Sequence, residues 1–182
     1  MARMALLSLA DEAVRASVAA RLQLDGITVT DAAGHDVPET IDILVLDFLS
    51  PAPRRFIGSD PAEWFAGVHA ALTAPFQLIR SAAPALSRSE AGRIVLIGRG
   101  WSAAGDADST AAAAVHGAAI ALMKTLARDL GPAGITVNKV AMPSGRVDTT
   151  AAAAAVGYLV SPLAGATTGQ ILSVGRGGEL RP

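Results

Sequence analysis

The 182-residue chain has no cysteine, which excludes both a disulfide framework and a zinc–thiolate site. Aromatic residues make up only 4% of the sequence, and the net charge is −1 at pH 7. Because nucleic-acid-binding domains carry a basic surface, we expect no nucleic-acid partner. The three histidines, His35, His69 and His116, show no ligand spacing, so we also expect no metal site.

Long apolar runs are also missing from the sequence. A membrane-spanning helix requires about 20 apolar residues, and we therefore expect no membrane segment. The apolar residues 4–9 are few and are followed at once by Asp11 and Glu12, which is typical of a first strand rather than a signal peptide. We expect a cytoplasmic location. No linker rich in proline, glycine or serine divides the chain, which predicts a single domain over residues 1–182 with 51% hydrophobic content.

The most informative pattern lies between His116 and Thr149. A helix-like run is followed by the strand-like residues 134–138 and then by residues 143–149. This succession resembles the active-site helix and following strand of short-chain dehydrogenases/reductases, and is most similar to 3-oxoacyl reductase-type members. Residues 41–45 are nearly continuously apolar, as in a buried parallel strand. The resemblance implies an α/β fold, a Rossmann-like, doubly wound parallel sheet.

The resemblance places the family's catalytic tetrad on residues that cannot perform its chemistry. Reduction of a carbonyl by hydride requires a proton donor at the developing alkoxide; in this family a tyrosine donates and a neighbouring lysine lowers the pKa of that tyrosine. The tyrosine position falls on Ala112 and the lysine position on His116. Arg99, beside Gly98, stands in place of the serine, and Ala71 corresponds to the asparagine. We therefore predict no catalytic residue on this chain.

The nucleotide-binding turn of the family is altered as well. Its glycines allow a tight turn and a close approach of the backbone to the pyrophosphate. The pattern falls on residues 8–15, where the three glycine positions hold Leu9, Ala13 and Arg15. Asp11 and Glu12 would cap the helix predicted over residues 10–25, in the place where a helix N-terminus receives an anion. The resemblance implies no cofactor on this chain, with NAD(P) on a partner subunit instead.

Two segments of the family pattern are missing. Only nine residues separate Asp31 from Ile41, whereas a helical crossover between parallel strands takes a dozen or more. The family places a helix, an edge strand and another helix there, so we predict that the edge strand is lost. The family's substrate-binding flap would follow Thr149, but the chain continues directly into the run Ala151–Ala155. We therefore expect no substrate lid.

The helices that make subunit contacts in the family remain apolar. Asp60, Pro61 and Glu63 predict the start of one helix. A second predicted helix, residues 111–130, has apolar side chains on two faces, of which its own sheet can cover only one. In the family these two helices pair with a second subunit in a four-helix arrangement. The predicted interface residues are Trp64, Val68, Ala112, Val115, Ala119, Leu122 and Leu126.

The leading hypothesis is a degenerate subunit, a pseudoenzyme, that assembles with an active NAD(P)-dependent paralogue in a hetero-oligomer, or with itself. By analogy, such a complex acts on acyl thioester substrates. The alternative is an oxidoreductase or small-molecule-binding homologue with a relocated active site that uses His116 and Arg99. Arg99 can equally fill the vacated cofactor site through a salt bridge to Asp47 or Asp11. The only tyrosine, Tyr158, is interpreted as a packing residue.

Overall fold

The computed structural model describes residues 2–32, 37–99, 106–143 and 148–175. Within these ranges a single sheet of six parallel strands runs in the order β2-β1-β3-β4-β5-β6. The predicted α/β, doubly wound parallel fold is therefore confirmed. The strands are β1 (Met4–Ser8), β2 (Thr28–Asp31), β3 (Ile43–Asp47), β4 (Arg93–Arg99), β5 (Thr136–Met142) and β6 (Ile171–Ser173).

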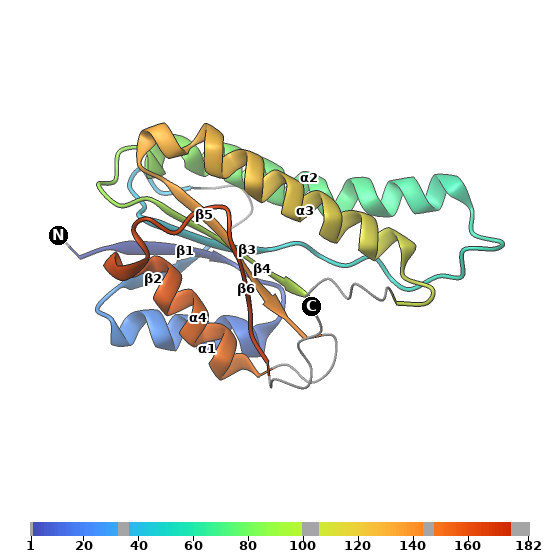
Figure 1. Cartoon of the computed structure of the whole chain (residues 1–182), viewed down its shortest axis with the longest axis horizontal. Coiled ribbons are helices and arrows are strands. Elements are labelled where there is room, and N and C mark those ends of the chain that lie inside the picture. The colour runs from blue at the N-terminus through green and yellow to red at the C-terminus, as the bar shows by residue number, and fades with distance from the viewer. Residues whose placement is uncertain (1, 33–36, 100–105, 144–147, 176–182) are drawn as a thin grey trace.

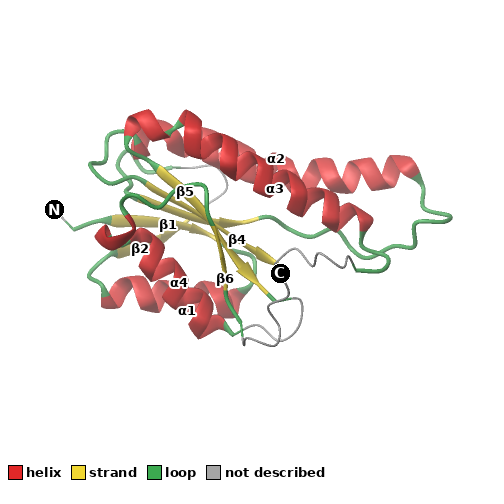
Figure 2. Cartoon of the chain, in the orientation of Figure 1, coloured by secondary structure: helices red, strands yellow, loops and turns green. Residues whose placement is uncertain are grey.

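Helices cover both faces of this sheet (Figures 1 and 2). One face carries α2 (Pro61–Leu86) and α3 (Thr110–Asp129), and the other carries α1 (Glu12–Leu24) and α4 (Thr149–Val160). Two short 3-10 helices follow α3 and α4, at Gly131–Ala133 and Pro162–Ala164. The N-terminal half of α2 extends past the carboxyl ends of the strands (Figure 1).

Successive side chains of the central strands point to opposite faces of the sheet, and this gives the protein one hydrophobic core on each side. In β3, Leu44 and Leu46 belong to the core beneath α2 and α3. Ile43 and Val45 belong to the core beneath α1 and α4. Each of these side chains is at most 1% exposed, and burying one stabilises the fold by roughly 1.5–3 kcal/mol. A strand buried on both faces must be apolar throughout, which explains the apolar run in the sequence.

The edge of the sheet differs from the full family pattern as predicted. β2 pairs only with β1, so it is the edge strand of the described sheet. The chain then passes over β1 to β3 through residues 32–42, of which 33–36 lie outside the described part. The described residues of this connection form neither a helix nor a strand.

An aspartate carboxylate caps the N-terminus of three of the four long helices in the described part of the chain, α1, α2 and α4. Asp11 accepts hydrogen bonds from the backbone N–H groups of Ala13 (2.9 Å) and Val14 (3.1 Å) at the start of α1. Asp60 accepts from Ala62 N–H before α2, and Asp148 from Ala151 N–H before α4. Such caps satisfy amides that have no partner inside the helix. The predicted cap positions Asp11 and Asp60 are confirmed.

Helices α3 and α4 bear on two expectations drawn from the sequence, and the second of these is wrong. By length and composition alone, α3 is apolar enough to cross a membrane, although core helices pass the same test. Only 22% of its most apolar window is buried, because a single row, Val115, Ala119, Met123 and Ala127, faces the core. Tyr158 on α4 is 45% exposed, so it is a surface residue and not a packing residue. Its neighbours Val156 and Leu159 point into the core instead.

The cap of α1 can be tested by substitution. Asp11→Ala removes the acceptor for two backbone amides and should lower the free energy of unfolding by about 1 kcal/mol. Asp11→Asn keeps an acceptor oxygen in the same place and should lose much less. Chemical denaturation of both variants measures the difference; equal loss would mean that the charge and not the cap is responsible.

Candidate functional site

The candidate site lies at the carboxyl edge of the sheet, where open parallel sheets bind their ligands. Two cavities of about 310 Å³ each adjoin this edge and share Leu49, Ala70 and Ala71. The first, here called the turn-side cavity, lies where β1, β2 and β3 end and includes Ser8, Leu9, Arg15, Asp31 and Asp47. The second, the helix-side cavity, lies between residues 49–54 and the starts of α2 and α3 and includes Ser50, Trp64, Thr110 and Ala111.

Arg15 crosses the turn-side cavity where the third glycine of the family turn would stand. Its guanidinium donates to the Glu12 carboxylate (2.8 and 2.5 Å) and to Asp31 (3.0 and 3.2 Å). The hydrogen bond to Glu12, and then the charge of Asp31, raise the pKa of Arg15, and the same hydrogen bond lowers the pKa of Glu12. The Asp31 carboxylate at the end of β2 is therefore already engaged by a side chain of this protein.

The third charged residue that lines the turn-side cavity, Asp47, is acidic. Asp47 accepts a hydrogen bond from Ala10 N–H at 2.8 Å, and burial raises the pKa of the Asp47 carboxyl. Asp11 occupies the N-terminus of α1 as its cap. Among the described residues that line this cavity, Arg15 is the only cation. The surroundings are therefore unfavourable for a pyrophosphate, which needs free amides and a positive field.

The structure also shows where the residues at the four tetrad positions lie. Ala71 is buried on α2, at the junction of the two cavities, and Ala112 is half-buried on α3. Arg99 ends β4, but its side chain lies outside the described part, as do Trp101 and Ser102. The predicted contacts of Arg99 with Asp47 or Asp11 therefore fall outside it too. Among the described residues, no three histidines or carboxylates are grouped as metal ligands would be.

His116 does take part in a polar contact at this edge. Its Nε2 shares a hydrogen bond of 3.1 Å with the Ser50 hydroxyl. His116 is half-buried on α3, whereas Ser50 is exposed and lines the helix-side cavity. The histidine at the family's lysine position is thus connected to a cavity through a serine that follows β3.

Lys139 is a residue of the site that sequence reasoning missed. It lies on β5, is only 2% exposed, and its Nζ has no hydrogen-bond partner among the described residues. Burial lowers the pKa of the Lys139 ammonium. Its Cε and the His116 ring both come within 4.0 Å of the point where a Cβ on Gly98 would lie. The available signal was a lysine inside the otherwise uncharged residues 134–142.

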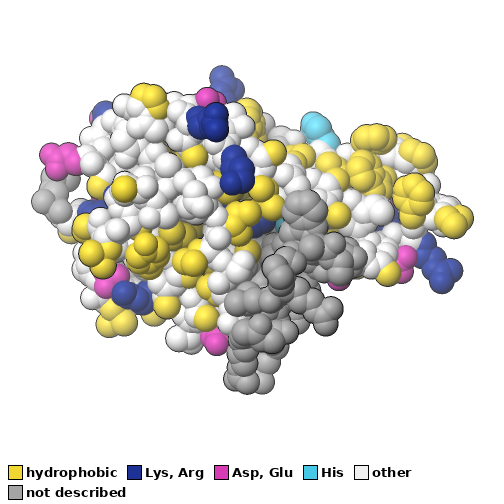
Figure 3. Space-filling view, in the orientation of Figure 1, with side chains coloured by type: hydrophobic (Ala, Val, Ile, Leu, Met, Phe, Trp, Pro, Cys, Tyr) yellow, Lys and Arg dark blue, Asp and Glu magenta, His cyan; other side chains and the backbone are white. Residues whose placement is uncertain are grey.

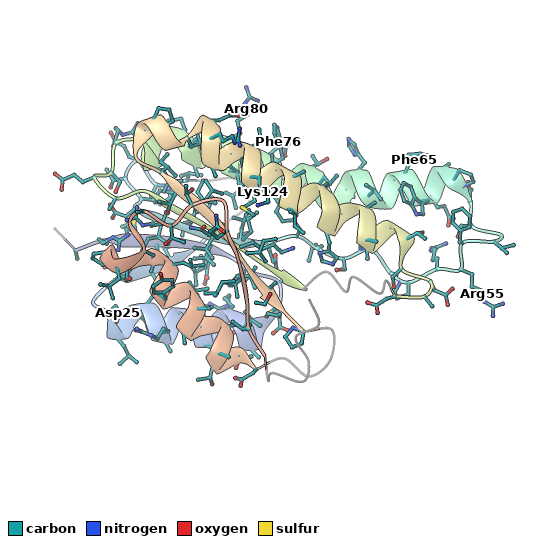
Figure 4. The ribbon with its side chains drawn as sticks, in the orientation of Figure 1. Asp25, Arg55, Phe65, Phe76, Arg80 and Lys124 are labelled. Carbon is teal, nitrogen blue, oxygen red and sulfur yellow. The ribbon has the colours of Figure 1, made fainter. Side chains whose placement is uncertain are left out.

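The chain's other lysine has a different environment. Lys124 is exposed on α3 and donates to the carbonyl of Gly169 (Figure 4). Only Lys139 therefore places an amine in the interior of the protein.

The predicted interface set is corrected by the burial of α3. Val115 and Ala119 are 0% and 1% exposed, and they pack under the helix in the chain's own core. Val68, Leu122 and Leu126 are half-buried against the same core. Trp64 donates from Nε1 to the Thr110 hydroxyl at 3.0 Å, which ties α2 to α3 within the chain. The sheet-facing residues of α3 are therefore unavailable to a partner.

Other residues of this layer face outward. On α2, Phe65 is 66% exposed and Phe76 is 50% exposed (Figure 4). On α3, the exposed side includes the small residues Ala113, Gly117 and Ala121. Hydrophobic side chains also gather over the N-terminal half of α2 (Figure 3). We call Phe65, Phe76, Ala113, Gly117 and Ala121 the outer face of α2 and α3.

Sequence comparison gives the class to which this fold and site belong. Residues 5–155 match the family model described as enoyl-(acyl carrier protein) reductase. The chain therefore belongs to the short-chain dehydrogenase/reductase family, which confirms the resemblance. It is 28% identical to the 3-oxoacyl-(acyl-carrier-protein) reductase FabG of Vibrio harveyi, over 82% of this chain and 69% of that protein. It is 27% identical to FabG of Vibrio cholerae, over 75% and 66%. The chain thus spans about two thirds of the length of these relatives.

Solved structures show the same fold. The acetoin dehydrogenase YohF of Salmonella typhimurium superposes with a TM-score of 0.82 at 20% identity, covering 96% of this chain and 95% of that one. A putative 3-oxoacyl-reductase of Bacillus thuringiensis gives a TM-score of 0.78 at 17% identity, covering 96% and 97%. The architecture of these proteins is therefore retained while most side chains differ.

The buried amine of Lys139 predicts a characteristic pH dependence of stability. Because the folded-state pKa is depressed, the unfolded chain binds more protons between that pKa and the unfolded value of about 10.4. Stability from this group should therefore rise with pH across that window. Lys139→Met removes the buried, unpartnered polar group and should raise the free energy of unfolding at pH 7 by about 1–3 kcal/mol.

Urea denaturation of both proteins from pH 6 to pH 10 measures this effect. The gain from Lys139→Met should shrink as pH rises. A gain that is constant with pH would show that the folded state does not depress the pKa of Lys139.

Proposed function

We propose that this chain is a non-catalytic subunit of the short-chain dehydrogenase/reductase family, a pseudoenzyme that assembles with an active NAD(P)-dependent paralogue in a hetero-oligomer. The paralogue binds the cofactor and performs the hydride transfer. This chain stabilises that subunit or shapes the entrance to its substrate site. The outer face of α2 and α3 is the observation that carries the proposal.

Loss of the family's proton donor supports a non-catalytic role. Ala112 and Ala71 offer only methyl groups at two tetrad positions, and neither can donate a proton to an alkoxide. Tyr158 is on α4, on the opposite face of the sheet from α3 (Figure 1). It therefore cannot take over the position of the missing tyrosine.

The polar groups of the turn-side cavity support the assignment of the cofactor to the partner. Arg15 is bonded to both Glu12 and Asp31 where a dinucleotide would need space and free amides. A bound nucleotide would have to break these contacts and place its phosphates near Asp11 and Asp47. Like charges at such short range oppose binding.

Nucleotide binding by the isolated chain tests this part of the proposal. Titration calorimetry with NADH and with NADPH should show no saturable heat up to roughly millimolar concentration, the upper end of ordinary dissociation constants. The triple variant Leu9→Gly, Ala13→Gly, Arg15→Gly, which restores the glycines, is the matched comparison. Micromolar binding by the unmodified chain would contradict the assignment of the cofactor to the partner.

The outer face is suited to a helix pair of another subunit. Phe65 and Phe76 present aromatic rings to solvent, and the small side chains of Ala113 and Gly117 permit close approach of a second helix. Aromatic side chains are enriched at the buried centres of protein interfaces. A paralogue of the same fold offers the corresponding two helices, which is why a family member, and not an unrelated protein, is the proposed occupant.

The relatives suggest the chemistry of the complex. Two of them are named as 3-oxoacyl-(acyl-carrier-protein) reductases, so we propose acyl thioesters as substrates of the active partner. The proposed complex is cytoplasmic, where the partner would draw on the nicotinamide cofactor pool.

Gly117 offers a test that separates assembly from folding. A Cβ at this position would meet no atom of the chain within 4 Å, and leucine is a better helix former than glycine by up to about 1 kcal/mol. Gly117→Leu should therefore leave the chain folded or make it slightly more stable. It should weaken assembly by at least about tenfold, since the side chain would separate the facing helices.

Ala20→Leu provides the control for this test, because Ala20 is an exposed position of α1 on the opposite layer. Analytical ultracentrifugation of the complex with each variant gives the dissociation constants. Equal affinities for the two variants would exclude the outer face as the interface.

A second candidate function is an oxidoreductase or small-molecule-binding homologue with a relocated site that uses His116 and Arg99. The hydrogen bond between Ser50 and His116 favours it, because it links the histidine to the helix-side cavity. Under this candidate the isolated chain would turn over a carbonyl substrate with NAD(P)H, and His116→Gln would abolish the turnover without changing assembly.

A further inference from the structure

Lys139 has surroundings that a lysine ordinarily avoids. Its neighbours across the sheet are Leu96 on β4 and Ile171 on β6. Leu96 is buried in the core beneath α2 and α3, together with Val137, two residues before Lys139 on β5. No carboxylate or carbonyl among the described residues accepts a hydrogen bond from Nζ. A charged ammonium is costly in such a place, so burial shifts the balance of Lys139 toward the neutral amine relative to an exposed lysine.

A neutral amine is a nucleophile, and the neighbourhood supplies both a path and a proton carrier. Ser50 is exposed at the helix-side cavity, His116 is half-buried behind it, and Lys139 is buried beyond. The Lys139 Cε and the His116 ring both approach the point where a Cβ on Gly98 would lie, at 3.8 and 4.0 Å, and glycine leaves that point empty. Ser50 lines the cavity and bonds His116, and His116 lies near Lys139, so the three residues form a contiguous series from the cavity wall to the buried amine.

We propose that Lys139 forms an imine with a small aldehyde or ketone that enters from the helix-side cavity. This activity concerns a ligand of this chain and goes beyond the proposed role in assembly. The amine nitrogen forms a bond to the carbonyl carbon, and the carbonyl π bond breaks as its oxygen takes a proton. The hydroxyl of the resulting carbinolamine takes a second proton and leaves as water, and the nitrogen, which gives up two protons over the sequence, forms the carbon–nitrogen double bond.

His116 is placed to carry the protons of this sequence. The imidazole is the side chain whose ordinary pKa allows it to give and take protons near neutral pH. Ser50, bonded to Nε2 at 3.1 Å, holds the ring and connects it to the cavity. The reaction consumes no redox equivalent, so it needs neither the missing tyrosine nor a bound nucleotide.

The cavity indicates the class of carbonyl compound. Its volume of about 310 Å³ suits a short molecule, and Trp64, Ala71 and Ala111 supply apolar walls. Its only described cation, Arg54, forms an ion pair with Glu63, and its third charged residue, Asp108, is acidic, so no free positive charge is left to bind an anionic group. The ligand class is therefore a neutral, short-chain aldehyde or ketone.

The sequence makes this proposal simple to test, since the chain has two lysines, one buried and one exposed. The folded full-length protein is treated at pH 7 with propanal and cyanoborohydride, which reduces the imine to a stable secondary amine. Peptide mass spectrometry then gives the rates at Lys139 and Lys124. An ordinary lysine has a pKa of about 10.4 and is almost wholly protonated at pH 7, so we expect Lys139 to react at least about tenfold faster.

Two lysine variants, and labelling in urea, show which lysine carries the label. Lys124→Arg should keep the rapid label, and Lys139→Met should lose it. In urea the two lysines should react at equal rates, because the difference depends on the fold. The rate at Lys139 should level off at a lower pH than the rate at Lys124.

His116→Gln and Gly98→Ala examine the path. The Cβ of Gly98→Ala would make ordinary contacts with Lys139 and His116, at 3.8 and 4.0 Å, so this variant should fold and slow the labelling of Lys139. His116→Gln should slow it as well while leaving Lys124 unchanged. Labelling of Lys124 with Lys139 untouched in the folded protein would overturn the proposal, whether or not the chain assembles with a partner.

Discussion

The N-terminus of α1 presents backbone amides that need an acceptor, and Asp11 of the same chain accepts two of them. In a nucleotide-binding Rossmann fold this helix end receives the pyrophosphate. Once a built-in carboxylate occupies it, glycines are no longer required in the preceding turn, and Leu9 and Arg15 can stand there. Arg15 then bonds Glu12 and Asp31 across the turn-side cavity. The cap of one helix thereby determines the chemistry of the whole edge above β1 and β2.

The part of the carboxyl edge beside the helix-side cavity differs from the family pattern in another way. The family's lysine position on α3 holds His116, whereas an amine now comes from β5 through Lys139. A lysine inside a core lowers stability, so its presence calls for a reason beyond packing. Our proposals give the two cavities separate roles. The turn-side cavity has lost the ability to bind the cofactor, and the helix-side cavity leads to a reactive amine. The outer face of α2 and α3 is independent of both.

Much of the fold could be predicted from the sequence. The apolar residues 41–45 predicted a strand buried on both faces, which the structure places at Ile43–Asp47. Asp60 followed by Pro61 predicted the start of a helix, and α2 begins there. The short connection after Asp31 correctly indicated a lost edge strand. The orientation of α3 could not be predicted, because alanine and glycine on every side leave its core-facing side undefined; Val115 and Ala119 were therefore placed on the wrong face. Lys139 was missed because a single charged residue in a strand does not reveal its neighbours across the sheet.

The central claim is that this chain works as a subunit beside an active family member. Native mass spectrometry of the protein isolated from its own host, with every polypeptide and nucleotide identified, tests it most directly. The account predicts a fixed-ratio complex with a short-chain dehydrogenase/reductase that has an intact tetrad, one nicotinamide nucleotide for each partner chain, and none on this chain. A homo-oligomer that retains a nicotinamide nucleotide on this chain would contradict it.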